Sequence, residues 1–222
     1  MKLRQNEIIL FQGDSITDGN RGRNLDPNHV MGHGYQFIVG AKLHVDNIDK
    51  NIQTFNRGIS GNRISDLYGR WLEDCINLKP TMLSILIGVN DILHAFEENS
   101  GSSPERYEKI YRMLLDEALF HNPDMRIVIM EPFVGKYYGA HEERSSFFHD
   151  YVKKLQPICK KLAEEYTAAF VPLQDILDKY QQKTAPQNII WDGIHPTITG
   201  HEIIARRWLS CVSEKFGTGD NI

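Results

Sequence analysis

Apolar residues along this chain gather in short uninterrupted runs, and between the runs they recur every three or four positions. The runs predict strands at residues 8–11, 52–55, 83–87, 126–130 and 169–171. Strands without polar alternation are typical of a parallel sheet that is covered on both faces. The intervening periodicity is helical, so the pattern predicts one doubly wound α/β/α domain of about five strands.

Three segments have clear helical patterns, and two of them also carry a helix start signal. Residues 104–120 repeat apolar side chains on one face and are preceded by Ser103, a favourable N-cap. Residues 148–166 form a second long helical pattern. The last helix is expected to start at Thr199, with Glu202 completing a capping box.

The composition limits the class of protein without pointing to a macromolecular partner. At 222 residues, with 41% hydrophobic and 24% charged residues, the chain fits one globular domain over residues 1–222. The net charge of −4 gives no electrostatic reason to expect nucleic acid or a membrane surface as a partner. No apolar stretch approaches the roughly 20 residues of a membrane helix.

Cysteine usage favours a reducing location. Cys75, Cys159 and Cys211 are odd in number, far apart and without a C-x-x-C spacing. Their apolar surroundings favour buried small side chains over a metal or redox site. The apolar run near the N-terminus is too short for a secretory signal and fits a strand better. We therefore expect a cytoplasmic protein.

Candidate chemical groups follow three predicted strands directly. Ser15 comes after the first strand, the glycine-rich segment that ends at Gly61 after the second, and Asn90 after the third. Because the carboxyl ends of parallel strands lie at one edge of a sheet, we expect these groups to share a site. A serine hydroxyl is a potential nucleophile, whereas a glycine amide and an asparagine side chain can stabilise an oxyanion. Taken singly, each segment is also compatible with an ordinary turn or helix cap.

The partners that a serine nucleophile requires occur near the other end of the chain. Asp192 and His195 stand three apart in a segment broken by Gly193 and Pro196, which favours a loop. A histidine can accept the serine proton while a carboxylate fixes its tautomer. A zinc site of Asp192, His195 and His201 lacks a good ligand spacing, so no metal is expected.

Together these segments resemble a known enzyme family. Gly13-Asp14-Ser15, Gly58-Ile59-Ser60-Gly61-Asn62, Gly88-Val89-Asn90-Asp91 and Asp192-Gly193-Ile194-His195 are similar to the four sequence blocks of the SGNH (GDSL-type) hydrolases. The resemblance implies a flavodoxin-like α/β/α three-layer sandwich with a mostly five-stranded parallel sheet. It makes Ser15 the nucleophile, His195 the base and Asp192 its partner. Ser15, Gly61 and Asn90 would then be the oxyanion-hole donors. We expect no cofactor.

A closer resemblance concerns the substrate. Segments that include Gly34-Tyr35, Arg70-Trp71 and Trp191-Asp192 are similar to the bacterial intracellular acetylxylan esterases, which remove acetyl groups from xylo-oligosaccharides. This resemblance implies a serine esterase for short acyl esters, chiefly acetyl esters of carbohydrate, and a possible homo-oligomer. The residues expected to contact substrate are Asp14, Tyr35, Asn62 and Trp191. Phe133, Tyr137 and Tyr138 could also offer flat surfaces to a sugar ring, and the alternative for Phe133 and Tyr138 is packing in the core or at a subunit contact.

Two alternative functions remain open at the level of sequence. A lysophospholipase or thioesterase could use the same five groups, but the polar loop over residues 17–34 does not suit a slot for a long acyl chain. A non-catalytic carbohydrate-binding protein on this fold would not need all five groups. Acyl-chain preference and reaction with a serine-directed probe separate these hypotheses.

Overall fold

The computed structural model describes residues 1, 3–24, 26–136 and 142–217, and it contains a five-stranded parallel sheet. The strand order is β2-β1-β3-β4-β5, which is the flavodoxin-like order. The strands are β1 (Ile8–Gly13), β2 (Gln53–Asn56), β3 (Met82–Leu86), β4 (Arg126–Met130) and β5 (Ala169–Val171). The predicted fold class is therefore confirmed, and each predicted strand lies within two residues of its observed position.

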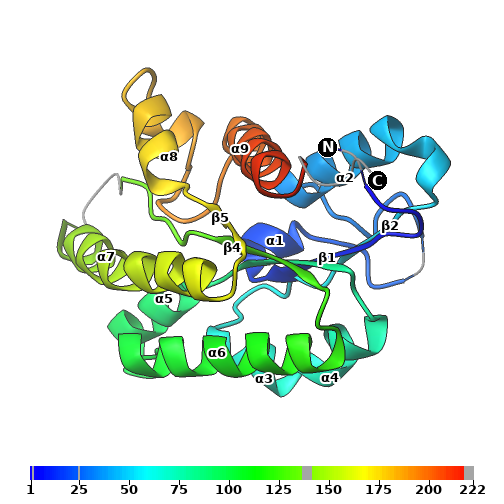
Figure 1. Ribbon diagram of the computed structural model, residues 1–222. Coiled ribbons are helices and arrows are strands. Elements are labelled where there is room, and N and C mark those ends of the chain that lie inside the picture. The colour runs from blue at the N-terminus through cyan, green and yellow to red at the C-terminus, as the bar shows by residue number, and fades with distance from the viewer. Residues whose placement is uncertain (2, 25, 137–141, 218–222) are drawn as a thin grey trace.

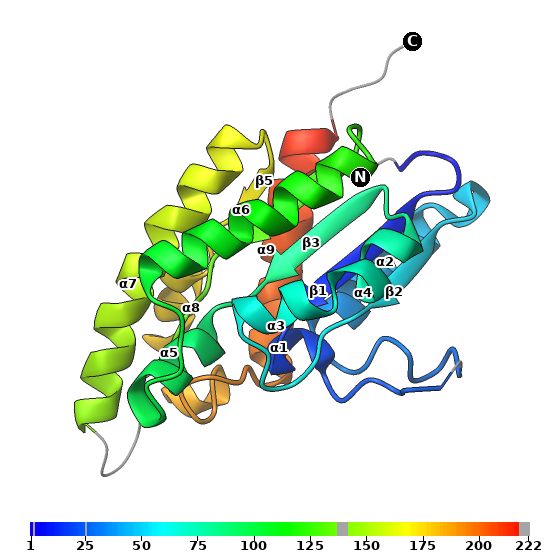
Figure 2. The same ribbon diagram turned by 90° about the horizontal axis from the view of Figure 1, so that it is seen from below.

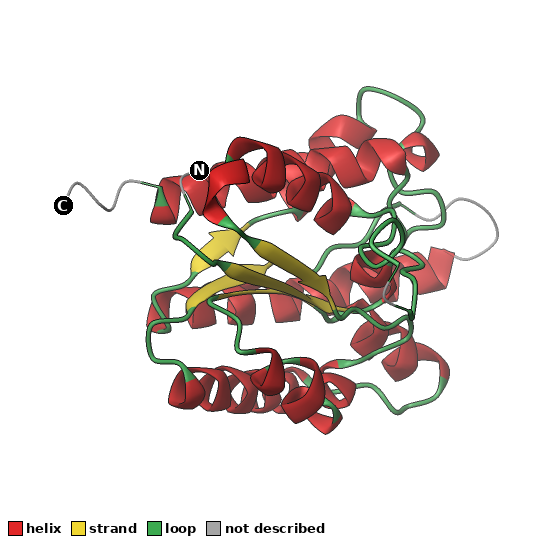
Figure 3. Cartoon of the chain, turned by 90° about the vertical axis from the view of Figure 1, so that its right-hand side faces the viewer, coloured by secondary structure: helices red, strands yellow, loops and turns green. Residues whose placement is uncertain are grey.

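Helices cover both faces of this sheet, and Figure 3 shows the sheet between two helical layers. Figure 1 shows α2 and α9 on one side and α6 with α7 on the other. The helices are α1 (Ser15–Asp18), α2 (Tyr35–Asp46), α3 (Ile64–Gly69), α4 (Trp71–Asp74), α5 (Val89–Glu97), α6 (Pro104–His121), α7 (Glu142–Glu165), α8 (Gln174–Gln181) and α9 (Ile198–Phe216). Short 3₁₀ turns span Ile48–Lys50, Ile76–Leu78 and Pro186–Asn188.

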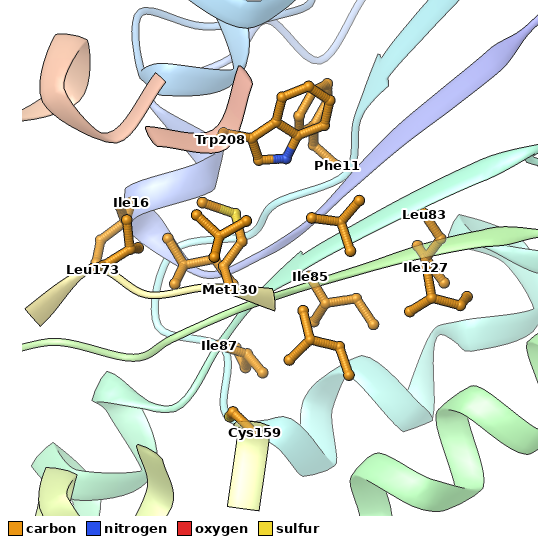
Figure 4. Packing of buried hydrophobic residues seen from close by; sticks show 14 of the residues in the cluster. Phe11, Ile16, Leu83, Ile85, Ile87, Ile127, Met130, Cys159, Leu173 and Trp208 are labelled. Carbon is orange, nitrogen blue, oxygen red and sulfur yellow. The ribbon is translucent and has the colours of Figure 1, made fainter. Parts of the chain in front are cut away.

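The core is continuous across the sheet because its central strands are buried on both faces. Every residue of β3 and β4 is buried, as their largely apolar sequences predict. Trp208 of α9 packs on Phe11 of β1 and donates its indole N–H to Ser84 Oγ at 3.0 Å. Figure 4 shows this pair on one side of the strands and Cys159 near Ile87 on the other.

Helix starts were predicted with mixed success. Ser103 caps α6 as expected, because its side chain accepts from Arg106 N. The predicted capping box of α9 is wrong, because Thr197 is the N-cap and its Oγ1 accepts from Gly200 N at 3.3 Å. Thr199 then lies within the first turn, and Glu202 pairs with Arg206 at 2.6 Å instead of reaching back to a cap.

Three further properties concern the helices, the thiols and the possible metal ligands. Within the part of the chain that the structure describes, no helix is long and apolar enough to cross a membrane. Cys75 and Cys159 are buried, Cys211 is partly buried, and all three thiols are free. Among the described residues, no cluster of three histidine, cysteine or acidic side chains could hold a metal ion.

Candidate active site

Ser15 lies just beyond the carboxyl edge of the sheet, where β1 turns into α1. Asp14 is the N-cap of this helix, and its Oδ1 accepts from Ile16 N at 3.0 Å. A Cβ at Gly13 would lie 2.3 Å from the Leu86 carbonyl and 2.4 Å from Thr17 Oγ1, so only glycine fits between β3 and the returning helix. The glycine and aspartate that precede the serine therefore shape the turn that presents it.

The loop between the 3₁₀ turn at Pro186–Asn188 and α9 brings a histidine and an aspartate to Ser15. His195 Nε2 lies 2.9 Å from Ser15 Oγ, and His195 Nδ1 lies 2.6 Å from Asp192 Oδ2. A bridge between Ile190 and Pro196 closes the loop. The other Asp192 oxygen accepts from the backbone N–H groups of residues 194 and 195, at 2.9 and 2.7 Å. The three side chains therefore form a continuous hydrogen-bonded relay.

The charges within the relay orient the imidazole and make it a stronger base. Burial alone would raise the pKa of Asp192, but hydrogen bonds from His195 and from the backbone outweigh it and lower that pKa. The hydrogen bond to Asp192 raises the pKa of His195 above 6.5, and the nearby Asp14 adds to this effect. An ionised Asp192 accepts the proton of Nδ1. Consequently Nε2 is the ring nitrogen that is free to accept from Ser15.

Two further donors reach the same edge from β2 and β3, and Figure 2 shows α1, α3 and α5 gathered at this end of the sheet. After β2, Ile59 to Asn62 form a turn in which Asn62 N donates to Ile59 O at 3.1 Å. Gly61 has a φ of +84°, and nothing lies within 4 Å of the position that a Cβ would take there. Asn90 in α5 donates from Nδ2 to Asn62 O at 3.1 Å, which leaves its second amide hydrogen available.

A family model shows where this arrangement belongs. Residues 11–203 match the GDSL-like lipase/acylhydrolase family. The chain belongs to this family. An acetylxylan esterase from Geobacillus stearothermophilus is 32% identical over 216 residues, which cover 94% of this chain and 95% of that esterase. The protein is therefore a carboxylic ester hydrolase of the GDSL family.

Solved structures of similar proteins agree over nearly the whole chain. A GDSL-like lipase from Parabacteroides merdae superposes with a TM-score of 0.86 at 34% identity, covering 97% of this chain and 98% of that one. A variant of the Geobacillus acetylxylan esterase gives 0.85 at 31% identity, with 96% of both chains covered. Structures of that esterase include three described as catalytic mutants, in which a serine, an aspartate or a histidine is replaced by alanine.

Several polar residues fix the backbone around this GDSL site through hydrogen bonds. The sequence pattern alone does not reveal them. Asn56 Nδ2 donates to the carbonyls of Thr17, Asp18 and Met31 at 2.7, 3.1 and 3.0 Å, and thereby ties β2 to the nucleophile turn. His201 Nδ1 accepts from Tyr35 N at 3.1 Å and so caps α2 from α9. Burial lowers the pKa of His201 to about 4 and keeps the ring neutral.

The residues expected to contact substrate divide into buried and exposed sets. Tyr35 is 0% exposed, with its hydroxyl 3.0 Å from Thr17 Oγ1, and Asp14 is 1% exposed. Both support the nucleophile turn from within the core, so the expectation of direct contact is corrected for them. Asn62 is partly exposed, but its Oδ1 accepts from Arg70 Nε at 2.8 Å.

The aromatic candidates also differ in how exposed they are. Trp191 is 61% exposed, and its ring stacks on that of His195 with centroids 6.4 Å apart. It therefore offers a free aromatic face beside the base. Phe133 is only 1% exposed, so of its two alternatives the structure favours packing in the core. Tyr137 and Tyr138 lie outside the described residues.

The raised pKa of His195 predicts the acid limb of the pH–rate profile. Only the neutral ring can accept the Ser15 proton, so activity is lost as the pH falls through this pKa, and the midpoint for kcat/KM should lie above 6.5. Hydrolysis of p-nitrophenyl acetate from about pH 5 to about pH 9 measures it. Burial raises the pKa of Asp14 to about 7, so Asp14→Asn, which keeps a capping oxygen, is the control. If Asp14→Asn lost the acid limb of the profile, the assignment of this limb to His195 would be contradicted.

Proposed function

We propose that this GDSL-family enzyme is a serine esterase that removes short acyl groups, chiefly acetyl, from carbohydrate esters such as acetylated xylo-oligosaccharides. The observation that carries the proposal is the relay in which Ser15 Oγ, His195 and Asp192 are linked by contacts of 2.9 and 2.6 Å. The 32% identity to an acetylxylan esterase, over 94% of the chain, supports the substrate class. The serine, aspartate and histidine replaced in the catalytic mutants of that esterase support the same roles here.

The proposed reaction has two steps that use one histidine. In the first, His195 Nε2 accepts the proton of Ser15 as Oγ attacks the ester carbonyl carbon. The resulting oxyanion accepts hydrogen bonds from the Ser15 and Gly61 amides and from the Asn90 side chain. His195 then gives this proton to the departing sugar oxygen, which leaves as a free hydroxyl, and the acyl group stays on Ser15. In the second step, water gives a proton to His195 and attacks the acyl carbon. His195 returns that proton to Ser15 Oγ as the bond from Oγ to the acyl carbon breaks, which releases the carboxylic acid and the free serine.

The surroundings of the relay favour a sugar as the alcohol portion. The exposed face of Trp191, next to Asp192, suits stacking against a sugar ring. Tyr35 and Phe133 are closed into the core and offer no apolar slot at the surface. The lysophospholipase or thioesterase alternative, which needs room for a long chain, is not favoured. We also propose a reducing, cytoplasmic location, which three free thiols suit, and self-association remains a prediction.

The substrate class is tested with purified protein, p-nitrophenyl esters from acetyl to octanoyl and a panel of acetylated sugars. The value of kcat/KM should be highest for acetyl and fall with chain length. A rise with chain length would contradict the proposal. A fluorophosphonate probe should form an adduct on Ser15, whereas the absence of an adduct would favour a carbohydrate-binding protein.

Replacing Trp191 tests the sugar platform separately. We expect Trp191→Ala to raise KM for an acetylated xylo-oligosaccharide by about two- to tenfold, the loss expected for one aromatic contact. KM for p-nitrophenyl acetate, which lacks a sugar, should stay near the wild-type value. Trp191→Phe retains a flat ring, so its KM for the xylo-oligosaccharide should lie between that of the wild type and that of Trp191→Ala. An equal change in KM for both substrates would contradict a sugar-binding role.

A further inference from the structure

Asp18 is a buried carboxylate between the nucleophile helix and the turn that contains Gly61, and the proposed reaction does not use it. It is the last residue of α1 and is only 2% exposed. Its Oδ2 accepts from both Ser60 N and Ser60 Oγ at 3.0 Å. Its Oδ1 accepts from Arg21 N at 3.2 Å. Asp18 therefore connects the helix that begins at Ser15 with the turn that presents Gly61.

The guanidinium group of Arg23 completes the environment of this carboxylate. Arg23 donates to both Asp18 oxygens, at 3.1 and 2.7 Å, and its own side chain is 54% exposed. Burial alone would raise the pKa of Asp18, but hydrogen bonds from Arg23 and Ser60 outweigh it and lower that pKa. Asp18 is consequently ionised at neutral pH, and its bonds to Ser60 are charge-assisted, the stronger kind.

In the Ile59–Asn62 turn, the orientation of the peptide between Ser60 and Gly61 decides where the Gly61 N–H points. In such a turn the amides of the two central residues are not used by the turn itself. The first central amide, that of Ser60, points to Asp18. The second, that of Gly61, has no bonded acceptor among the residues the structure describes. The φ of +84° at Gly61 is that of the third position of a type II turn.

The other common orientation of this peptide would reverse the dipole next to Ser15. Type I and type II turns differ by roughly 150° in ψ of the second residue, which turns the peptide between Ser60 and Gly61 over. In the type I form the Ser60 carbonyl would replace the Gly61 N–H, so an acceptor would face the developing oxyanion. The bond from Ser60 N to Asp18 fixes the preceding peptide, between Ile59 and Ser60. Ile59 N, which donates to Gly13 O at 3.1 Å, fixes the start of the turn.

We propose that Asp18 is a positioning residue that holds the Ile59–Asn62 turn so that the Gly61 N–H faces the oxyanion. This inference rests on the proposed esterase function. Asp18 touches neither the relay nor the reacting atoms, so it acts through Ser60 and the turn. Its removal should therefore weaken stabilisation of the transition state and leave binding of the ground state nearly unchanged.

The first experiment compares Asp18→Ala with Arg23→Gln and Ser60→Ala in the full chain. For Asp18→Ala we expect kcat for p-nitrophenyl acetate to fall about tenfold to hundredfold, less than the 10²–10³-fold typical of losing a donor outright, with KM within about threefold. Arg23→Gln and Ser60→Ala keep the bond from Ser60 N to Asp18 and should retain kcat within about fivefold. A kcat for Asp18→Ala within about threefold of wild type would overturn the proposal.

A second measurement separates positioning from a general loss of structure. Alanine at position 18 leaves room for a proline ring at position 60, and proline is favoured at the second position of a type II turn. Asp18→Ala/Ser60→Pro should therefore recover most of the lost kcat, because the ring holds the turn without the carboxylate. If the double variant is as slow as Asp18→Ala, the proposal fails. If Asp18→Ala does not fold, Asp18→Asn, which retains one acceptor oxygen, is measured in its place.

A small boronic acid provides an independent readout of the oxyanion donors. It forms a tetrahedral adduct on Ser15, so its affinity should fall in parallel with kcat in Asp18→Ala, whereas KM should not change in parallel. Unchanged affinity together with a lowered kcat would overturn the proposal. A wild-type protein that does not hydrolyse esters would remove the proposed function and this inference with it. An active wild type with an equally active Asp18→Ala would remove this inference alone.

Discussion

Replacing Ser15 by alanine should lower kcat for acetyl-ester hydrolysis by at least about 10⁴-fold and leave the protein folded. The variant loses the hydroxyl oxygen that lies 2.9 Å from the Nε2 of His195, and water cannot form the acyl-enzyme in its place. The side chain is small and lies on the four-residue helix α1 at the surface edge of the sheet, so the core is untouched. Steady-state hydrolysis of p-nitrophenyl acetate and a thermal melt measure the two properties.

The chain contains a matched control for this substitution. Ser100 also approaches a histidine and an acid, with its Oγ 3.4 Å from His94 Nδ1 and Glu98 Oε2 2.9 Å from the same nitrogen. Because serine and acid share one ring nitrogen, this cluster cannot relay a proton as the Ser15 site does. Ser100→Ala should therefore retain wild-type kcat. Comparable losses in the two variants, or undiminished turnover by Ser15→Ala, would contradict the mechanism.

Replacing Asp192 by asparagine should lower kcat by about 10⁴-fold, although the side chain keeps its shape. The asparagine oxygen can still accept from the backbone N–H groups of residues 194 and 195, which Asp192 Oδ1 binds at 2.9 and 2.7 Å. Its amide group then faces His195 Nδ1 and donates to it. The ring must place its proton on Nε2, and a protonated Nε2 cannot accept from Ser15.

The effect of Asp192→Asn on pH dependence distinguishes this reason from simple disruption. The hydrogen bond to Asp192 is the main cause of the raised pKa of His195, so the residual activity should have its acid limb at lower pH than the wild type. Glu98→Gln, the same change beside His94, is the control and should affect neither kcat nor the limb. An unchanged limb in Asp192→Asn, with kcat near wild type, would show that Asp192 does not orient the base.

The fold was accessible from the sequence because its signal is local. Apolar runs such as residues 127–130 fit strands that are buried on both faces, and the intervals between the runs hold the helical period. The boundary of α9 was not accessible in the same way. Thr197 and Thr199 are both acceptable N-caps by residue type, and the choice depends on the extended backbone that follows Pro196.

The site was accessible only in part. Ser15, Gly61, Asn90, Asp192 and His195 could be predicted because the nature of each side chain or backbone suggests its chemistry and the strand ends suggest a common edge. Their supports were not found, because Asn56 and Asp18 act through contacts with residues about 40 positions away that no local pattern encodes. Tyr35 was misassigned for the same reason, since its burial depends on how α2 packs against α9.

The distance along the chain between nucleophile and base has a consequence for synthesis on the ribosome. His195 follows Ser15 by 180 residues and lies in the loop closed by Ile190 and Pro196, just ahead of the final helix. A nascent chain that ends before this loop already contains the five strands β1 to β5 and the two residues proposed as further oxyanion donors, Gly61 and Asn90. Such a chain lacks His195, so premature termination products and fragments that end before Ile190 should be inert toward esters rather than partly active.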